Sequence, residues 1–86
     1  MAYSVVIKPA AERDLKKLAP DAQRQVLRAL ESLEENPFPQ GVKKLAGMDL
    51  YRMRTGQYRI VYSVERKRLQ VLVVKIGHRR EIYRNL

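Results

Sequence analysis

The spacing of apolar residues changes twice in the first half of the chain. Residues 3–7 are mostly β-branched, which predicts a short strand that ends before Pro9. From Pro9 onward apolar residues recur every three or four positions, which predicts an amphipathic helix. A second helix begins at Pro20 and keeps this spacing to a stop at Pro37. Two helices joined this tightly are expected to form an antiparallel pair.

The second half of the chain has the residue pattern of strands. Two runs rich in Tyr, Val and Ile flank Gly56 and Gln57, so residues 50–64 are predicted to form a β-hairpin. A charged turn then leads to a nearly all-apolar run at 69–76, which Gly77 interrupts. A strand that is apolar on both faces is typical of a central position in a sheet.

These elements together define an α+β fold class. The predicted order is β-α-α-β-β-β-α, with two antiparallel helices packed on a mainly antiparallel four-stranded sheet. Residues 37–49 are predicted to be a connector, and residues 79–86 a short closing helix. Eighty-six residues that are 45% hydrophobic suit one compact domain, so residues 1–86 are expected to form a single unit.

The predicted hairpin carries three arginines on one face. If the turn centres on Gly56 and Gln57, Arg54 lies opposite Arg59, and Arg52 projects to the same side. Like charges directly across a strand pair are destabilising, by roughly 0.2–1 kcal/mol. A like-charged pair that brings no gain in folding indicates a functional site that binds an anion. The alternative, that the three arginines simply point into water, explains their presence about equally well.

The distribution of charge narrows the choice of partner. The net charge is +9, and residues 1–50 hold eight basic side chains against seven acidic ones. Residues 51–86 hold ten against two, so nearly all of the excess lies in the last 36 positions. This asymmetry points to nucleic acid, an acidic protein or, least of all, an anionic membrane surface.

Cysteine and histidine usage excludes several classes of chemistry. The chain has no cysteine, hence no disulfide or thiolate ligand, and its single histidine argues against a zinc or iron site built by the protein. No run is long and apolar enough for a signal peptide or a membrane span. We therefore expect a soluble, cytoplasmic protein without a metal or cofactor.

A second basic group follows the last predicted strand and includes His78, Arg79, Arg80 and the nearby Tyr83. In an antiparallel meander this end of the strand lies beside the start of the preceding strand, which places Arg79 near Arg59. Arginine forks onto phosphate oxygens but is always protonated, so it cannot act as a base. Tyr83 can accept a proton as a phenolate, a form that neighbouring cations favour.

This set of residues would suffice for metal-free cleavage of RNA. RNA supplies its own nucleophile in the 2′-hydroxyl, so the protein needs only to position the backbone, stabilise the pentacoordinate phosphate and move protons. His78 is the candidate general acid. The alternatives are that Tyr83 merely covers the edge of the sheet and that His78 is an ordinary surface histidine.

Over nearly its whole length the sequence resembles the RelE/ParE superfamily of toxins from toxin-antitoxin modules, and specifically the RelE branch. The resemblance rests on the opening MAY, KLAG at 44–47, LYRMRTGQYRIVYSV at 50–64 and VKIGHRREIY at 74–83. It implies a RelE-like fold and a ribosome-dependent, metal-independent endoribonuclease. Such a toxin enters the ribosomal A site and cuts mRNA through the 2′-hydroxyl, which inhibits translation.

The resemblance also assigns roles to individual residues. The family's basic pair on the first hairpin strand falls on Arg52 and Arg54, its hairpin arginine on Arg59, its post-strand arginine on Arg79 and its C-terminal tyrosine on Tyr83. The implied catalytic residues are therefore Arg54, Arg59, Arg79 and Tyr83.

One departure from the family pattern changes the expected chemistry. The basic pair is typically lysine in the RelE branch, whereas both positions are arginine here. Arginine keeps phosphate binding but removes any proton transfer by a lysine, so proton abstraction shifts to Tyr83, with Arg79 or His78 near the leaving oxygen. The expected RNA-binding residues are Arg52, Arg54, Arg59, His78 and Arg80.

Two other functions are compatible with the sequence, and a protein partner is implied. ParE-like toxins resemble the RelE branch in fold but bind DNA gyrase and cleave no RNA, and a plain RNA-binding domain without chemistry is the third reading. The resemblance further implies a cognate acidic, partly disordered, RelB-like antitoxin that blocks the basic site. The other expected partners are the ribosome and mRNA.

Overall fold

The computed structural model describes residues 2–78, which form two helices and five strands. In chain order the elements are β1 (Ser4–Ile7), α1 (Pro9–Lys16), α2 (Pro20–Glu35), β2 (Lys43–Lys44), β3 (Tyr51–Thr55), β4 (Tyr58–Glu65) and β5 (Gln70–His78). This is the predicted α+β class and element order with one added strand. The closing helix predicted at 79–86 lies outside the described residues.

The strands form one mixed sheet in the order β1-β5-β4-β3-β2. β1 pairs with β5 in parallel, and the other neighbouring strands are antiparallel. The predicted number of four strands is wrong, because Lys43 and Lys44 of the expected connector pair with Arg52 and Tyr51. A strand of two residues is too short to produce an alternating pattern in the sequence.

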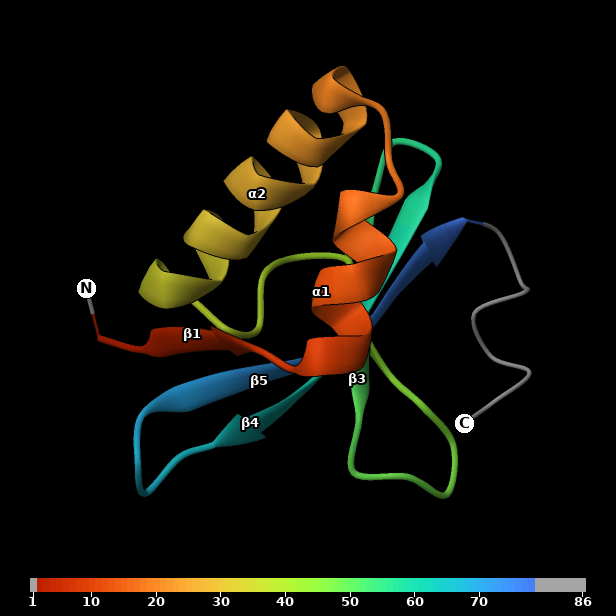
Figure 1. Ribbon diagram of the computed structural model, residues 1–86. Helices are drawn as coiled ribbons and strands as arrows, with labels where there is room; N and C mark the ends of the chain where they lie inside the picture. The colour runs from red at the N-terminus through yellow and green to blue at the C-terminus, as the bar shows by residue number, and fades with distance from the viewer. Residues whose placement is uncertain (1, 79–86) are drawn as a thin grey trace.

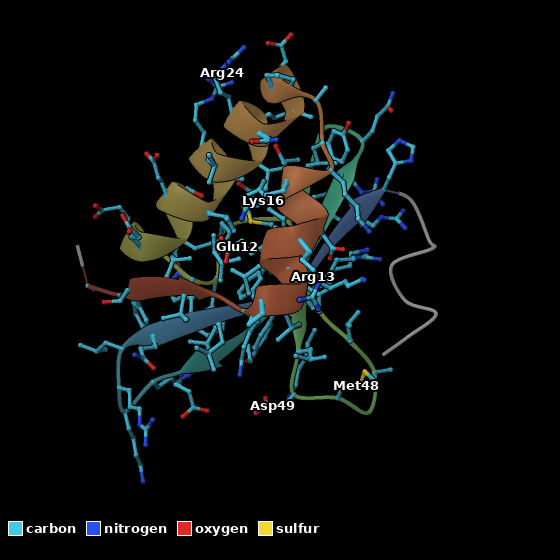
Figure 2. All side chains as sticks on the ribbon, viewed as in Figure 1. Glu12, Arg13, Lys16, Arg24, Met48 and Asp49 are labelled. Carbon is cyan, nitrogen blue, oxygen red and sulfur yellow. The ribbon has the colours of Figure 1, made fainter. Side chains whose placement is uncertain are left out.

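Both helices pack over the same face of the sheet, and the chain climbs along α1 and returns along α2 (Figure 1). Each begins with a proline, Pro9 or Pro20, whose missing N–H is not needed in the first turn. Charged side chains of the two helices, Arg24 of α2 among them, project away from the sheet (Figure 2). No helix among residues 2–78 covers the opposite face of the sheet.

The core lies between the helices and the sheet. Its buried side chains come from α1, α2, β4 and β5, namely Ala11, Leu15, Val26, Leu30, Leu33, Ile60, Tyr62, Val71, Val73 and Ile76. Tyr62 is fully buried, and its hydroxyl donates a 2.7 Å hydrogen bond to the carbonyl oxygen of Pro37. Its ring stacks on Tyr51, with ring centres 6.0 Å apart.

β5 extends beyond the interruption predicted at Gly77 and ends at His78. β1 stops beside Val73, so within residues 2–78 no strand lies next to the end of β5 on that side. Asp14 of α1 takes the place of the missing strand, because its Oδ2 accepts a 3.1 Å hydrogen bond from the backbone N–H of Ile76. Its Oδ1 also lies 3.5 Å from Lys75 Nζ. The helix thereby fixes the end of β5 that leads into the predicted site.

Candidate functional site

The hairpin places its three arginines as the sequence predicts. Arg54 lies directly opposite Arg59, and Arg52 lies opposite Val61. Neighbouring Ile60 is fully buried in the core below the helices. Because side chains alternate along a strand, the three arginines lie on the opposite face of the sheet, away from α1 and α2.

Two of the arginines on this face, Arg52 and Arg54, form no ion pair with any other described residue. Among residues 2–78, ion pairs join Glu12 to Lys16, Asp21 to Arg24 and Asp14 to Lys75, and none involves Arg52 or Arg54. Like charges directly across a strand pair, as at Arg54 and Arg59, are in general unfavourable by roughly 0.2–1 kcal/mol. An anionic ligand would reverse the sign of that contribution.

A hollow of about 300 Å³ opens at the turn of the hairpin and is lined by Arg54, Gly56, Gln57, Arg59 and His78. We call it the hairpin hollow. It brings together two arginines and the only histidine of the chain, from three neighbouring segments of sequence. Its lining is polar and basic, which suits a phosphate group and a sugar better than an apolar ligand.

The turn beneath the hairpin hollow is held by α2. Gly56 adopts a φ of 59°, a region that favours glycine, and a Cβ at this position would collide with the side-chain amide of Gln25. The same amide donates a 3.3 Å hydrogen bond to Thr55 Oγ1. The position of the turn is therefore fixed by a helix on the other side of the sheet.

His78 lies at the rim of the hairpin hollow. It pairs with Tyr58 across the strands, and the two rings meet edge to face with centres 5.5 Å apart. Its Nε2 lies 3.0 Å from Gln57 Oε1, so a proton on Nε2 can be donated to that oxygen. The imidazole is thus held against the turn beside the arginines.

A second hollow of about 250 Å³, which we call the connector hollow, is lined by Gly41, Lys43, Arg52 and Arg54. The two hollows share Arg54. The sequence did not identify Lys43, because its place beside Arg52 depends on the two-residue strand β2. The only available signal was the basic dipeptide formed by Lys43 and Lys44.

The other predicted site residues, Arg79, Arg80 and Tyr83, lie outside the described part of the chain. Arg79 directly follows His78, the last residue of β5. The structure thus brings together Arg52, Arg54, Arg59 and His78 of the predicted set. None of the helices within residues 2–78 has the length and apolar character needed to cross a membrane.

The fold is that of a small toxin domain, as comparisons with known proteins indicate. A family model described as the ParE toxin of the type II toxin-antitoxin system parDE matches residues 5–83. The chain is 33% identical to the putative toxin RelE1 of Methanocaldococcus jannaschii over 99% of both chains. It is also 33% identical to the toxin RelG of Mycobacterium tuberculosis, over 98% of this chain and 99% of that one.

Solved structures agree with the sequence comparisons. The archaeal RelE-RelB complex from Pyrococcus horikoshii matches with a TM-score of 0.83 and 35% identity, over 93% of this chain and 98% of that one. The chain belongs to the RelE/ParE family of toxins of type II toxin-antitoxin systems. The resemblance drawn from the sequence motifs is confirmed.

Proposed function

We propose that this toxin is an endoribonuclease that cuts mRNA in the ribosomal A site and so inhibits translation. The observation that carries the proposal is the pairing of Arg54 with Arg59 at a hollow that also contains His78. Homologues named RelE and RelG over almost the full length support the RelE branch of the family.

The proposed reaction is a transesterification within the RNA. The 2′-oxygen attacks the adjacent phosphorus, and the bond from phosphorus to the 5′-oxygen breaks. The products are a 2′,3′-cyclic phosphate and a 5′-hydroxyl. The attacking hydroxyl loses one proton and the leaving oxygen gains one, so the reaction requires a proton acceptor and a proton donor but no external nucleophile.

The arginines would stabilise the phosphate in the transition state. Arg54 and Arg59 line the hairpin hollow from opposite strands, so a phosphate there would meet a guanidinium from each side. Guanidinium groups bind phosphate oxygens through two parallel N–H donors, and charge at the reacting group is where fixed cations act most strongly. We assign the same role to Arg79, and RNA binding to Arg52 and Arg80.

Proton transfer requires groups other than arginine. We assign removal of the 2′-hydroxyl proton to Tyr83 and protonation of the leaving 5′-oxygen to His78, whose ring lines the hairpin hollow. No step in this scheme requires a metal ion or cofactor. The scheme also explains how two arginines can stand where the family commonly has lysines.

The proposed protein partner is an acidic antitoxin of the RelB type. A net charge of +9 and the basic face formed by Arg52, Arg54 and Arg59 favour an acidic chain. The Pyrococcus horikoshii homologue was crystallised as a complex with RelB, which supports the same kind of partner here. An antitoxin bound over Arg52, Arg54 and Arg59 would block access to both hollows.

A gyrase-directed toxin is the second candidate. The matching family model is described as a ParE toxin, which favours this reading. A toxin of that kind cleaves no RNA. The two candidate functions therefore differ in whether the protein cuts mRNA and whether that cleavage depends on Arg54 and Arg59.

The test is cleavage of a defined mRNA on programmed ribosomes. We expect Arg59→Ala and Arg54→Ala each to lower kcat about 100-fold, as for loss of one transition-state donor. Arg54→Ala should also raise KM, because Arg54 lines the connector hollow as well. The matched control is Arg28→Ala, which removes the same charge from an exposed position on α2.

The outcome separates the two candidate functions. If both Arg59→Ala and Arg54→Ala cleave mRNA at the rate of the wild type, the assigned site is wrong. No cleavage by folded wild-type protein, together with inhibition of DNA supercoiling by gyrase, would favour the ParE-like function.

A further inference from the structure

The connector hollow is a second basic site beside the hairpin hollow. Lys43 lies directly opposite Arg52, just as Arg54 lies opposite Arg59. The sheet therefore carries two cross-strand pairs of like charge, one after the other. The Lys43–Arg52 pair is unfavourable to folding unless an anion lies between its members.

The backbone beside Lys43 leaves room for a ligand. Gly41 adopts a φ of 89°, and a Cβ built at this position would have no neighbouring atom within 4 Å. Lys43 is exposed and Arg52 is half-buried, and neither forms an ion pair with any residue from 2 to 78. A compact ammonium and a planar guanidinium thus face one open space.

The two hollows are spaced to hold consecutive phosphates. Arg52 and Arg54 are two residues apart on β3, which corresponds to about 7 Å along a strand. Consecutive phosphates of an extended single strand can match this separation. Arg54 lines both hollows and would lie between the two phosphates.

We infer that the connector hollow binds the backbone phosphate adjacent to the cleaved one, with Lys43 and Arg52 as its ligands. The inference rests on the proposed function, because it takes the hairpin hollow as the place of cleavage. It assigns to Lys43 a role in RNA binding and none in the chemical step. The site reads the charge of the backbone and not the identity of the base.

The inference is tested by removing either the negative charge of the RNA phosphate or the positive charge of Lys43. Ribosomes would be programmed with mRNA carrying one uncharged methylphosphonate linkage, placed on the 5′ or the 3′ side of the cleaved phosphate. Wild type, Lys43→Gln and Lys44→Gln would be compared on these substrates and on unmodified mRNA. Lys44 is the matched control because it lies on the same strand and is also exposed, but projects to the other face.

Lys43→Gln should lower kcat/KM on unmodified mRNA about tenfold, mainly by raising KM. At one of the two linkages, the methylphosphonate should also lower the kcat/KM of the wild type about tenfold. On the same substrate the kcat/KM of Lys43→Gln should fall little further, because the substitution and the methylphosphonate remove the same contact. Lys44→Gln should keep the full sensitivity of the wild type. Thermal unfolding of each variant establishes that the comparison is made between folded proteins.

Two results would overturn the inference, and they are distinguishable. If the wild type cleaves and Lys43→Gln remains fully sensitive at both linkages, the connector hollow is not a phosphate site, while the proposed function stands. If folded wild type cleaves no mRNA at all, the proposed function fails and this inference fails with it.

Discussion

At the residue scale, Arg54 is proposed to bind an anion, and its position is one that should weaken the fold. It is exposed, lies opposite Arg59, and pairs with no acidic residue among residues 2–78. Arg54→Thr should therefore raise the free energy of unfolding by about 0.2–1 kcal/mol, because it removes a like-charge pair and supplies a residue suited to strands.

The same variant should lose mRNA cleavage. Urea denaturation, with Arg28→Ala as the control, measures the stability, and cleavage on programmed ribosomes measures the activity. A variant that is both less stable and fully active would contradict the assignment of Arg54 to an anion site.

Tyr62 has a purely structural role, although it lies in the most recognisable motif of the chain. Burial raises the pKa of its hydroxyl well above the usual value, with a smaller contribution from Tyr51. In the unfolded chain the hydroxyl ionises near pH 10. Above that pH the unfolded state binds fewer protons than the folded state, so stability should fall as the pH rises.

Tyr62→Phe should remove this loss of stability at high pH. At neutral pH it should cost about 1 kcal/mol, because the carbonyl oxygen of Pro37 loses its 2.7 Å hydrogen bond. Urea denaturation from pH 8 to 11 checks both effects, and mRNA cleavage at neutral pH should be unchanged. An equal loss of stability at high pH in both proteins would show that another group is responsible.

At the scale of elements, α1 positions the end of β5. Asp14→Ala removes the acceptor of the Ile76 N–H and should lower the free energy of unfolding by about 1–3 kcal/mol. Asp14→Asn keeps an oxygen acceptor and should cost less. Hydrogen exchange at the Ile76 amide should be fast in the alanine variant alone. Slow exchange there in both variants would show that Asp14 is not what holds this strand end.

The elements also show what the sequence could and could not predict. The hairpin register followed from Gly56 and Gln57, because a tight turn determines which residues of the two strands face each other. β2 was missed because it is only two residues long, and with it the place of Lys43 beside Arg52. These are contacts between distant segments, which local patterns do not encode.

The same distinction holds for the candidate site. Arg52, Arg54 and Arg59 could be assigned to one face from alternation alone, because they belong to one hairpin. The position of His78 beside Gln57 depends on β5 continuing through Gly77, where the sequence suggested an interruption. The roles of Arg79, Arg80 and Tyr83 stay predictions.

At the scale of the whole molecule, the fold separates stability from function by face. The helices cover one side of the sheet and bury the core (Figure 1). Arg52, Arg54 and Arg59 of the hairpin lie on the other side. Residues 51–86 supply nearly all of the net positive charge, and β3, β4 and β5 lie side by side within that segment. Part of the charge asymmetry of the sequence thus lies on one face of the sheet, at Arg52, Arg54 and Arg59.

The most direct test of the account compares two mRNAs on programmed ribosomes, one all-ribose and one with a single 2′-deoxyribose at the cleaved nucleotide, using wild type and Tyr83→Phe. The account predicts that wild type cuts only the all-ribose mRNA and leaves a 2′,3′-cyclic phosphate, and that folded Tyr83→Phe is slower by orders of magnitude. Cleavage of the deoxy-substituted mRNA at the same position would contradict attack by the 2′-hydroxyl. Full activity of Tyr83→Phe would contradict its role as proton acceptor.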